Sequence, residues 1–74
     1  MIKVYSRKAC HLCQRLKQIL DNKQIQYITV DLDLQPDEAT KLREMGIREL
    51  PQMWDGVEYI GGFNTSLRYI EEQV

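Results

Sequence analysis

The sequence predicts a small α/β domain whose elements follow the order βαβαββα. Two observations lead to this class. The spacing of apolar residues switches between about two and about 3.6 along the chain, and short turn signals separate the segments. The chain has 74 residues, of which 43% are hydrophobic and 28% are charged. This composition suits one globular domain over residues 1–74, and it excludes a disordered or low-complexity chain.

The first half of the chain predicts a strand, a helix and a second strand. Residues 2–5 alternate between apolar and polar side chains, as strands do. From Cys10 the period changes to that of a helix that ends near Asn22. The apolar residues on one face of this helix are Leu12, Leu16, Ile19 and Leu20. Residues 25–30 are rich in β-branched side chains and predict the second strand.

The middle of the chain predicts a second helix. Pro36 suits the first turn of a helix, and the acidic side chains of Asp37 and Glu38 suit the positive end of its dipole. Gly46 is a plausible stop signal at the other end. The expected apolar stripe consists of Ala39, Leu42 and Met45.

The last third of the chain predicts a hairpin and a third helix. Asp55-Gly56 is a turn signal between strands at residues 52–54 and 57–60. Any of three polar residues could cap the last helix: Asn64, Thr65 or Ser66. Its apolar positions are Phe63, Leu67, Ile70 and Val74.

This order of elements predicts a mixed sheet. A right-handed βαβ unit makes the first two strands parallel, and the hairpin adds two antiparallel strands. The three helices must then cover both faces of a four-stranded sheet. This arrangement is the smallest form of the thioredoxin fold.

The strongest chemical signal is the Cys-x-x-Cys motif formed by Cys10 and Cys13. Cys10 lies where a helix begins, so free backbone N–H groups and the helix dipole should lower the pKa of its thiol below about 8.5. Cys13, one turn later, should be more buried and less acidic. We therefore predict that Cys10 attacks and Cys13 resolves, with Arg7, Lys8 and His11 adding positive charge nearby.

Other interpretations of the motif are weaker. Zinc usually takes four nitrogen or sulfur ligands, and this motif supplies two without a second cysteine pair, so no metal is expected. His11 could lower the pKa of the Cys10 thiol. We favour an exposed first-turn residue instead, because adjacent residues on a helix do not face each other.

Net charge and hydropathy limit which binding partners and which cellular compartment we expect. A net charge of −1 and a pI of 5.7 argue against a general nucleic-acid or anionic-membrane binder. The sequence contains no apolar run typical of a signal peptide or a membrane span. We expect a cytoplasmic protein.

Two further segments leave alternatives open. Leu50-Pro51 is either a cis peptide that turns the Leu50 backbone toward an incoming peptide or an ordinary trans proline at the end of a loop. Gly61-Gly62 either lets the backbone approach a ligand at the next helix start or simply ends the hairpin.

Together these segments resemble the glutaredoxin family over nearly the whole chain. The resemblance rests on residues 7–13 with the basic Arg7, on residues 46–52 ending in Pro-Gln, and on residues 59–63 with Ile-Gly-Gly. It implies a cis Pro51 and glutathione as the reductant. The implied glutathione contacts are Arg7, Leu12, Leu50, Pro51, Gly62, Phe63, Asn64 and Thr65.

The resemblance also implies the activity. It indicates a monomeric dithiol oxidoreductase for electron transport and cell redox homeostasis. Such a protein reduces client protein disulfides and glutathione mixed disulfides, with ribonucleotide reductase as one plausible client. Two alternatives are a glutaredoxin-like redoxin reduced by thioredoxin reductase and a carrier of a [2Fe–2S] cluster.

Two departures from the family pattern and one difference from the redoxin group bear on this choice. His11-Leu12 replaces the commonest Pro-Tyr or Pro-Phe between the cysteines, and Glu38 stands where many members bind the glycine carboxylate of glutathione with Arg or Gln. Residues 59–64 differ from the Trp-Ser-Gly-Phe-Arg-Pro segment of the redoxin group, which favours a glutaredoxin proper.

Overall fold

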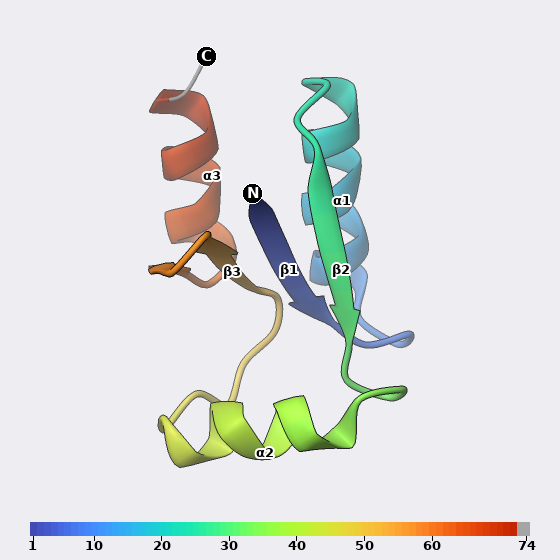
Figure 1. The fold of residues 1–74 in the computed structure, drawn as a ribbon. Helices are drawn as coiled ribbons and strands as arrows, with labels where there is room; N and C mark the ends of the chain where they lie inside the picture. The colour runs from blue at the N-terminus through green and yellow to red at the C-terminus, as the bar shows by residue number, and fades with distance from the viewer. Residues whose placement is uncertain (73–74) are drawn as a thin grey trace.

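The computed structural model describes residues 1–72 and contains the expected order of elements (Figure 1). These are β1 (Ile2–Ser6), α1 (His11–Asn22), β2 (Tyr27–Asp31), α2 (Pro36–Glu44), β3 (Gln52–Asp55), β4 (Glu58–Gly61) and α3 (Phe63–Glu72). The sheet order is β2-β1-β3-β4, with β1 parallel to β2 and the other pairs antiparallel. The predicted thioredoxin fold with its four-stranded mixed sheet is confirmed.

The main core lies between one face of the sheet and the helices α1 and α3. It forms because alternate residues of β1 point to this face, where they meet the apolar stripes of both helices. Its buried members are Ile2, Val4, Leu16, Leu20, Met53 and Ile70. This packing sets α1, and therefore the cysteine motif at its start, firmly against β1.

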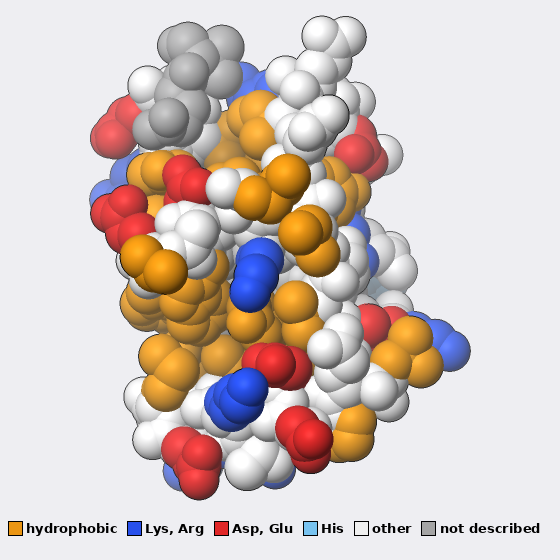
Figure 2. Space-filling view, viewed as in Figure 1, with side chains coloured by type: hydrophobic (Ala, Val, Ile, Leu, Met, Phe, Trp, Pro, Cys, Tyr) orange, Lys and Arg blue, Asp and Glu red, His pale blue; other side chains and the backbone are white. Residues whose placement is uncertain are grey.

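A smaller core lies on the opposite face, where α2 crosses the carboxyl ends of β1 and β2 (Figure 1). Its buried members are Val30, Leu32, Ala39 and Leu42. The rings of Tyr5, Trp54 and Tyr59 extend this face, with centroid distances of 4.9 and 4.6 Å. Figure 2 shows hydrophobic side chains gathered over β3 on this side.

Helix boundaries follow the sequence signals closely. α1 ends at Asn22 as predicted, and Pro36 is the first residue of α2. Gly46 has a φ of +80°, a left-handed conformation that glycine adopts without a steric penalty, and it follows the C-cap of α2 as expected. The turn of the hairpin comes one residue later than predicted, at Gly56-Val57.

Two apolar residues lie outside the cores that the spacing had assigned to them. Leu12 is 47% exposed, because the buried stripe of α1 runs through Cys13, Leu16 and Leu20 instead. Met45 is 57% exposed, because α2 ends one residue earlier and Met45 is its C-cap.

The predicted cap of the third helix is also wrong. α3 begins at Phe63, so Asn64, Thr65 and Ser66 lie within its first turn. Ser66 is fully buried, its N–H donates to the Gly62 carbonyl at 2.9 Å, and its hydroxyl donates to the Gly61 carbonyl at 3.3 Å. Val74 lies outside the described residues.

The end of the sheet remote from the cysteines is held by a polar contact. The Tyr69 hydroxyl on α3 donates to the Asp55 carboxylate at the end of β3, and the N-terminal ammonium lies 3.4 Å from the same carboxylate. The bond to Asp55 raises the pKa of Tyr69 to about 12. The same bond lowers the pKa of Asp55. None of the helices within residues 1–72 is long and apolar enough to cross a membrane.

Candidate active site

Three separate segments meet at the carboxyl end of β1. The antiparallel register places Tyr5 opposite Gln52 and Met53 opposite Gly61. The chain leaving β1, the chain entering β3 and the chain leaving β4 therefore lie at the same end of the sheet, where these strands begin or finish. These are the three segments that the sequence analysis singled out.

The two cysteines occupy different environments at this end of the sheet. Cys10 is the N-cap of α1, and its Sγ accepts a hydrogen bond from the Cys13 N–H at 3.2 Å. The two residues form a disulfide with a Cα–Cα distance of 5.3 Å. Cys13 is fully buried, whereas Cys10 is partly exposed. An incoming sulfur can therefore approach Cys10, and the helix N-terminus stabilises a thiolate there.

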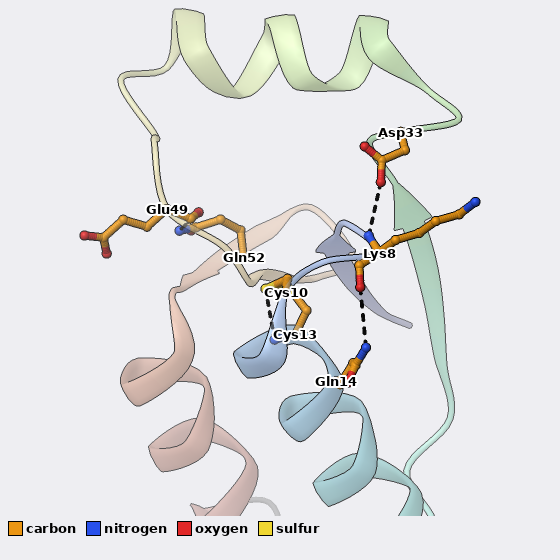
Figure 3. The surroundings of a disulfide bond; sticks show 7 residues. All are labelled: Lys8, Cys10, Cys13, Gln14, Asp33, Glu49 and Gln52. Carbon is orange, nitrogen blue, oxygen red and sulfur yellow. Dashed lines mark hydrogen bonds between the residues drawn. A yellow bond between two sulfur atoms is a disulfide. The ribbon is translucent and has the colours of Figure 1, made fainter.

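The loop that carries Cys10 is braced on both sides (Figure 3). The Lys8 N–H donates to the Asp33 carboxylate at 3.1 Å, and the Gln14 side chain donates to the Lys8 carbonyl at 3.4 Å. Asp33 is itself oriented by its N–H, which donates to the Asp31 carboxylate at 2.8 Å. The sequence analysis missed this brace. Its only signal was the Asp-x-Asp spacing, which is typical of a side chain that closes a turn.

The Leu50–Pro51 peptide bond is cis, which decides between the two alternatives left open by the sequence and confirms what the family resemblance implied. Pro51 is buried beside Gln52. The Gln52 side chain donates to the Glu49 carbonyl at 2.8 Å and accepts from the Tyr59 hydroxyl at 2.6 Å. The segment that enters β3 is thereby tied to β4. The role of Gln52 and Tyr59 was not predicted.

The two glycines at the end of β4 serve different purposes. Gly61 has a φ of +134°, and a Cβ there would lie 3.1 Å from the Thr65 Cβ. A Cβ on Gly62 would lie 3.8 Å from the Pro51 carbonyl oxygen, so this glycine borders the cis proline directly. Gly61-Gly62 thus ends the hairpin, and the approach of a ligand to this backbone stays a prediction.

The remaining residues predicted for the site differ in their location and exposure. Arg7 and Leu50 line one pocket. Asn64 and Thr65 are exposed on the first turn of α3, and Leu12 is exposed on the first turn of α1. Phe63 is half-buried and packs against the main core, so it also supports the fold. Sequence reasoning did not place Arg48 beside Arg7 in that pocket.

The described residues give no sign of a protein-held metal centre. His11 is exposed on the first turn of α1. Within residues 1–72, no group of three or more His, Cys, Asp or Glu side chains could hold a metal ion.

A partly exposed cysteine at a helix start, a buried cysteine one turn later and a neighbouring cis proline define a thiol-disulfide oxidoreductase of the thioredoxin fold. The glutaredoxin family model matches residues 2–60, so the chain belongs to the glutaredoxin family.

The relatives come from two branches of this family. The chain is 32% identical to the glutaredoxin-like protein NrdH of Salmonella typhimurium, over 89% of this chain and 82% of that protein. The NrdH-redoxin structure from Escherichia coli, described by its thioredoxin-like activity profile, has a TM-score of 0.80 at 28% identity, covering 93% and 91% of the chains. A buckwheat glutaredoxin–glutathione complex also has a TM-score of 0.80 at 28% identity, covering 97% of this chain and 69% of that one.

Proposed function

We propose that this chain acts as a monomeric, single-domain dithiol redoxin that reduces disulfides in client proteins. One observation carries the proposal: Cys10 is accessible at the start of α1, while Cys13 is buried within reach of it. An accessible sulfur can attack, and a buried neighbour can resolve the product. Ribonucleotide reductase is the client class suggested by the similarity to the NrdH group.

The reaction proceeds in two exchanges. The Cys10 thiolate attacks one sulfur of the client disulfide, and the other client sulfur leaves as a thiolate. Cys13 then loses its proton and attacks the Cys10 sulfur, which releases the second client thiolate and forms the Cys10–Cys13 disulfide. Two electrons pass from the cysteine pair to the client, and the client thiolates take up protons according to their pKa.

Glutathione is the first electron donor that we propose. Its two carboxylates suit the guanidinium of Arg7 and the exposed first turn of α3 at Asn64 and Thr65. Its thiolate would attack the Cys10 sulfur of the Cys10–Cys13 disulfide and release Cys13 as a thiolate, with the Leu50 backbone beside the cysteinyl unit. A second glutathione would then attack the bound glutathione sulfur, which releases the Cys10 thiolate and glutathione disulfide. Leu12, Pro51, Gly62 and Phe63 would complete the contacts. The fold shared with the glutaredoxin–glutathione complex supports this choice.

Thioredoxin reductase is the second candidate electron donor. The similarity to NrdH proteins favours it, since the solved Escherichia coli relative is described by a thioredoxin-like activity profile. Glu38 favours it as well, because an acidic residue would repel the glycine carboxylate of glutathione at the position where many glutaredoxins bind it. Glu38 is paired with Lys41 at 3.4 Å, which offsets part of this repulsion.

The cysteine roles are tested with two serine variants. We expect Cys10→Ser to abolish all disulfide reduction. Cys13→Ser should still remove glutathione from a glutathionylated peptide, because that step needs one thiol. An equal loss of deglutathionylation in both variants would contradict the assignment of roles.

The electron donor is tested by following NADPH oxidation in two coupled assays with the same disulfide client. One contains glutathione and glutathione reductase, and the other contains thioredoxin reductase alone. Turnover in the first assay only would support the glutathione site. Turnover in the second assay only would establish the redoxin alternative and remove the glutathione contacts from the proposal.

A further inference from the structure

A pocket of about 270 Å³ opens beside the candidate active site, between the chain leaving β1, the helix α2 and the chain entering β3. Three arginine side chains line it: Arg7, Arg43 and Arg48. Leu50, the residue before the cis proline, lines it too, so the pocket lies next to the segment that enters the active site. We call this cavity the arginine pocket.

The positive charge of the arginine pocket is not neutralised by close ion pairs. Within residues 1–72, no carboxylate lies within 4.0 Å of these three guanidinium groups. Among the described residues, the Arg43 guanidinium donates to the Thr40 hydroxyl alone, at 3.1 Å. Glu49 is the single acidic residue of the lining. Three cations against one anion favour a negatively charged occupant.

Part of the lining of the arginine pocket is apolar. It consists of the buried side chains of Leu32, Ala39 and Leu42 and of the half-buried Ile47. Glutathione carries two carboxylates and a thiol but no apolar side chain that could cover these groups. A polypeptide segment with both acidic and apolar residues matches the positive charge of the arginines and also covers the apolar lining.

We propose that the arginine pocket binds an acidic, apolar segment of the client polypeptide beside the disulfide that Cys10 attacks, and that Arg43 and Arg48 select such clients. This inference rests on the proposed function, since it names the client class of the same site. The larger cavities at the opposite end of the sheet, lined by Met1 and Ile25, lie too far from the cysteines to take part.

The test compares three synthetic peptides, each closed by one disulfide. Glutamate and leucine flank the cysteines in the first, lysine and leucine in the second, and glutamate and serine in the third. The pre-reduced protein is mixed with each peptide in a single turnover, without glutathione or any reductase, so that the result is independent of the electron donor. Each rate is divided by the rate of the same peptide with dithiothreitol, which removes differences in intrinsic reactivity.

We expect the glutamate–leucine peptide to react about fivefold or more faster than the lysine–leucine peptide, a factor that two surface charge contacts can supply. This ratio should fall as salt is added. The glutamate–serine peptide should be slower than the glutamate–leucine peptide, because it leaves the apolar lining uncovered.

Two variants locate the preference on the molecule. The double variant Arg43→Gln, Arg48→Gln should bring the ratio close to one. The matched control Arg68→Gln removes an exposed arginine on α3, away from the arginine pocket, and should keep the wild-type ratio. A wild-type ratio near one, or an equal change in the control, would overturn the inference while leaving the proposed function intact. No reduction of any peptide would overturn both.

Discussion

The hydrogen bonds of Gln52 allow a quantitative test of how the edge of the active site is held together. Gln52 is only 5% exposed, and its side chain joins the Glu49 carbonyl to the Tyr59 hydroxyl. Tyr59→Phe removes one of these two bonds and keeps the ring packed on Trp54. Gln52→Ala removes both bonds and some buried volume.

The expected magnitudes follow from the partners that remain. An intramolecular hydrogen bond contributes about 0.5–1.5 kcal/mol net, and an unsatisfied buried partner adds a further cost. We expect Tyr59→Phe to lower the free energy of unfolding by about 1 kcal/mol and Gln52→Ala by about 2–3 kcal/mol. A domain of this size has a total stability of about 4–10 kcal/mol, so both variants should still fold.

Urea unfolding of the wild type, the two single variants and the double variant forms a double-mutant cycle that measures these free energies. In the Gln52→Ala background, Tyr59→Phe should cost close to nothing, because the hydroxyl has already lost its partner. Tyr5→Phe is the matched control. Its ring also packs on Trp54, but its hydroxyl makes no hydrogen bond within residues 1–72. The reasoning fails if Tyr59→Phe costs no more than Tyr5→Phe, or costs the same with and without Gln52.

Three further predictions concern charge and pH. The Cys10 thiol should have a pKa below about 8.5, and a titration of thiolate ultraviolet absorbance that gives a value at or above this would contradict the mechanism. Arg7→Glu should slow reduction by glutathione about tenfold or more, since a well-made charged contact contributes about 1.5–3 kcal/mol. Reduction by dithiothreitol serves as the comparison, because that reductant has no carboxylate. Tyr69 has a pKa raised to about 12 by Asp55, so the native state holds the phenol proton more tightly than the unfolded chain. The stabilisation of the native state by the Tyr69–Asp55 bond is therefore complete below about pH 10 and is lost as the pH rises toward 12. Urea unfolding across this range should show a smaller loss for Tyr69→Phe than for the wild type, and equal losses would rule out the contribution of this bond.

The order of elements and the placement of the two cysteines at a helix start were accessible from the sequence. Helix boundaries such as Asn22 and Gly46, and the placement of Cys10 before Cys13 at a helix start, depend on residues within about one turn of each other. Periodicity nevertheless failed at Leu12. The arc of α1 that faces the sheet is set by how the helix packs, and that arc contains Cys13 instead.

Tertiary structure alone decided which distant groups meet at the site. The Lys8–Asp33 bond joins residues 25 positions apart, and the arginine pocket combines Arg7 with Arg43 and Arg48. Neither a local propensity nor a hydrophobic period encodes such pairings, because they exist only after the parallel and antiparallel strand pairs bring the loops to one edge. The cis state of Leu50–Pro51 belongs to the same group. The sequence allowed either isomer, and the folded surroundings determine which one is present.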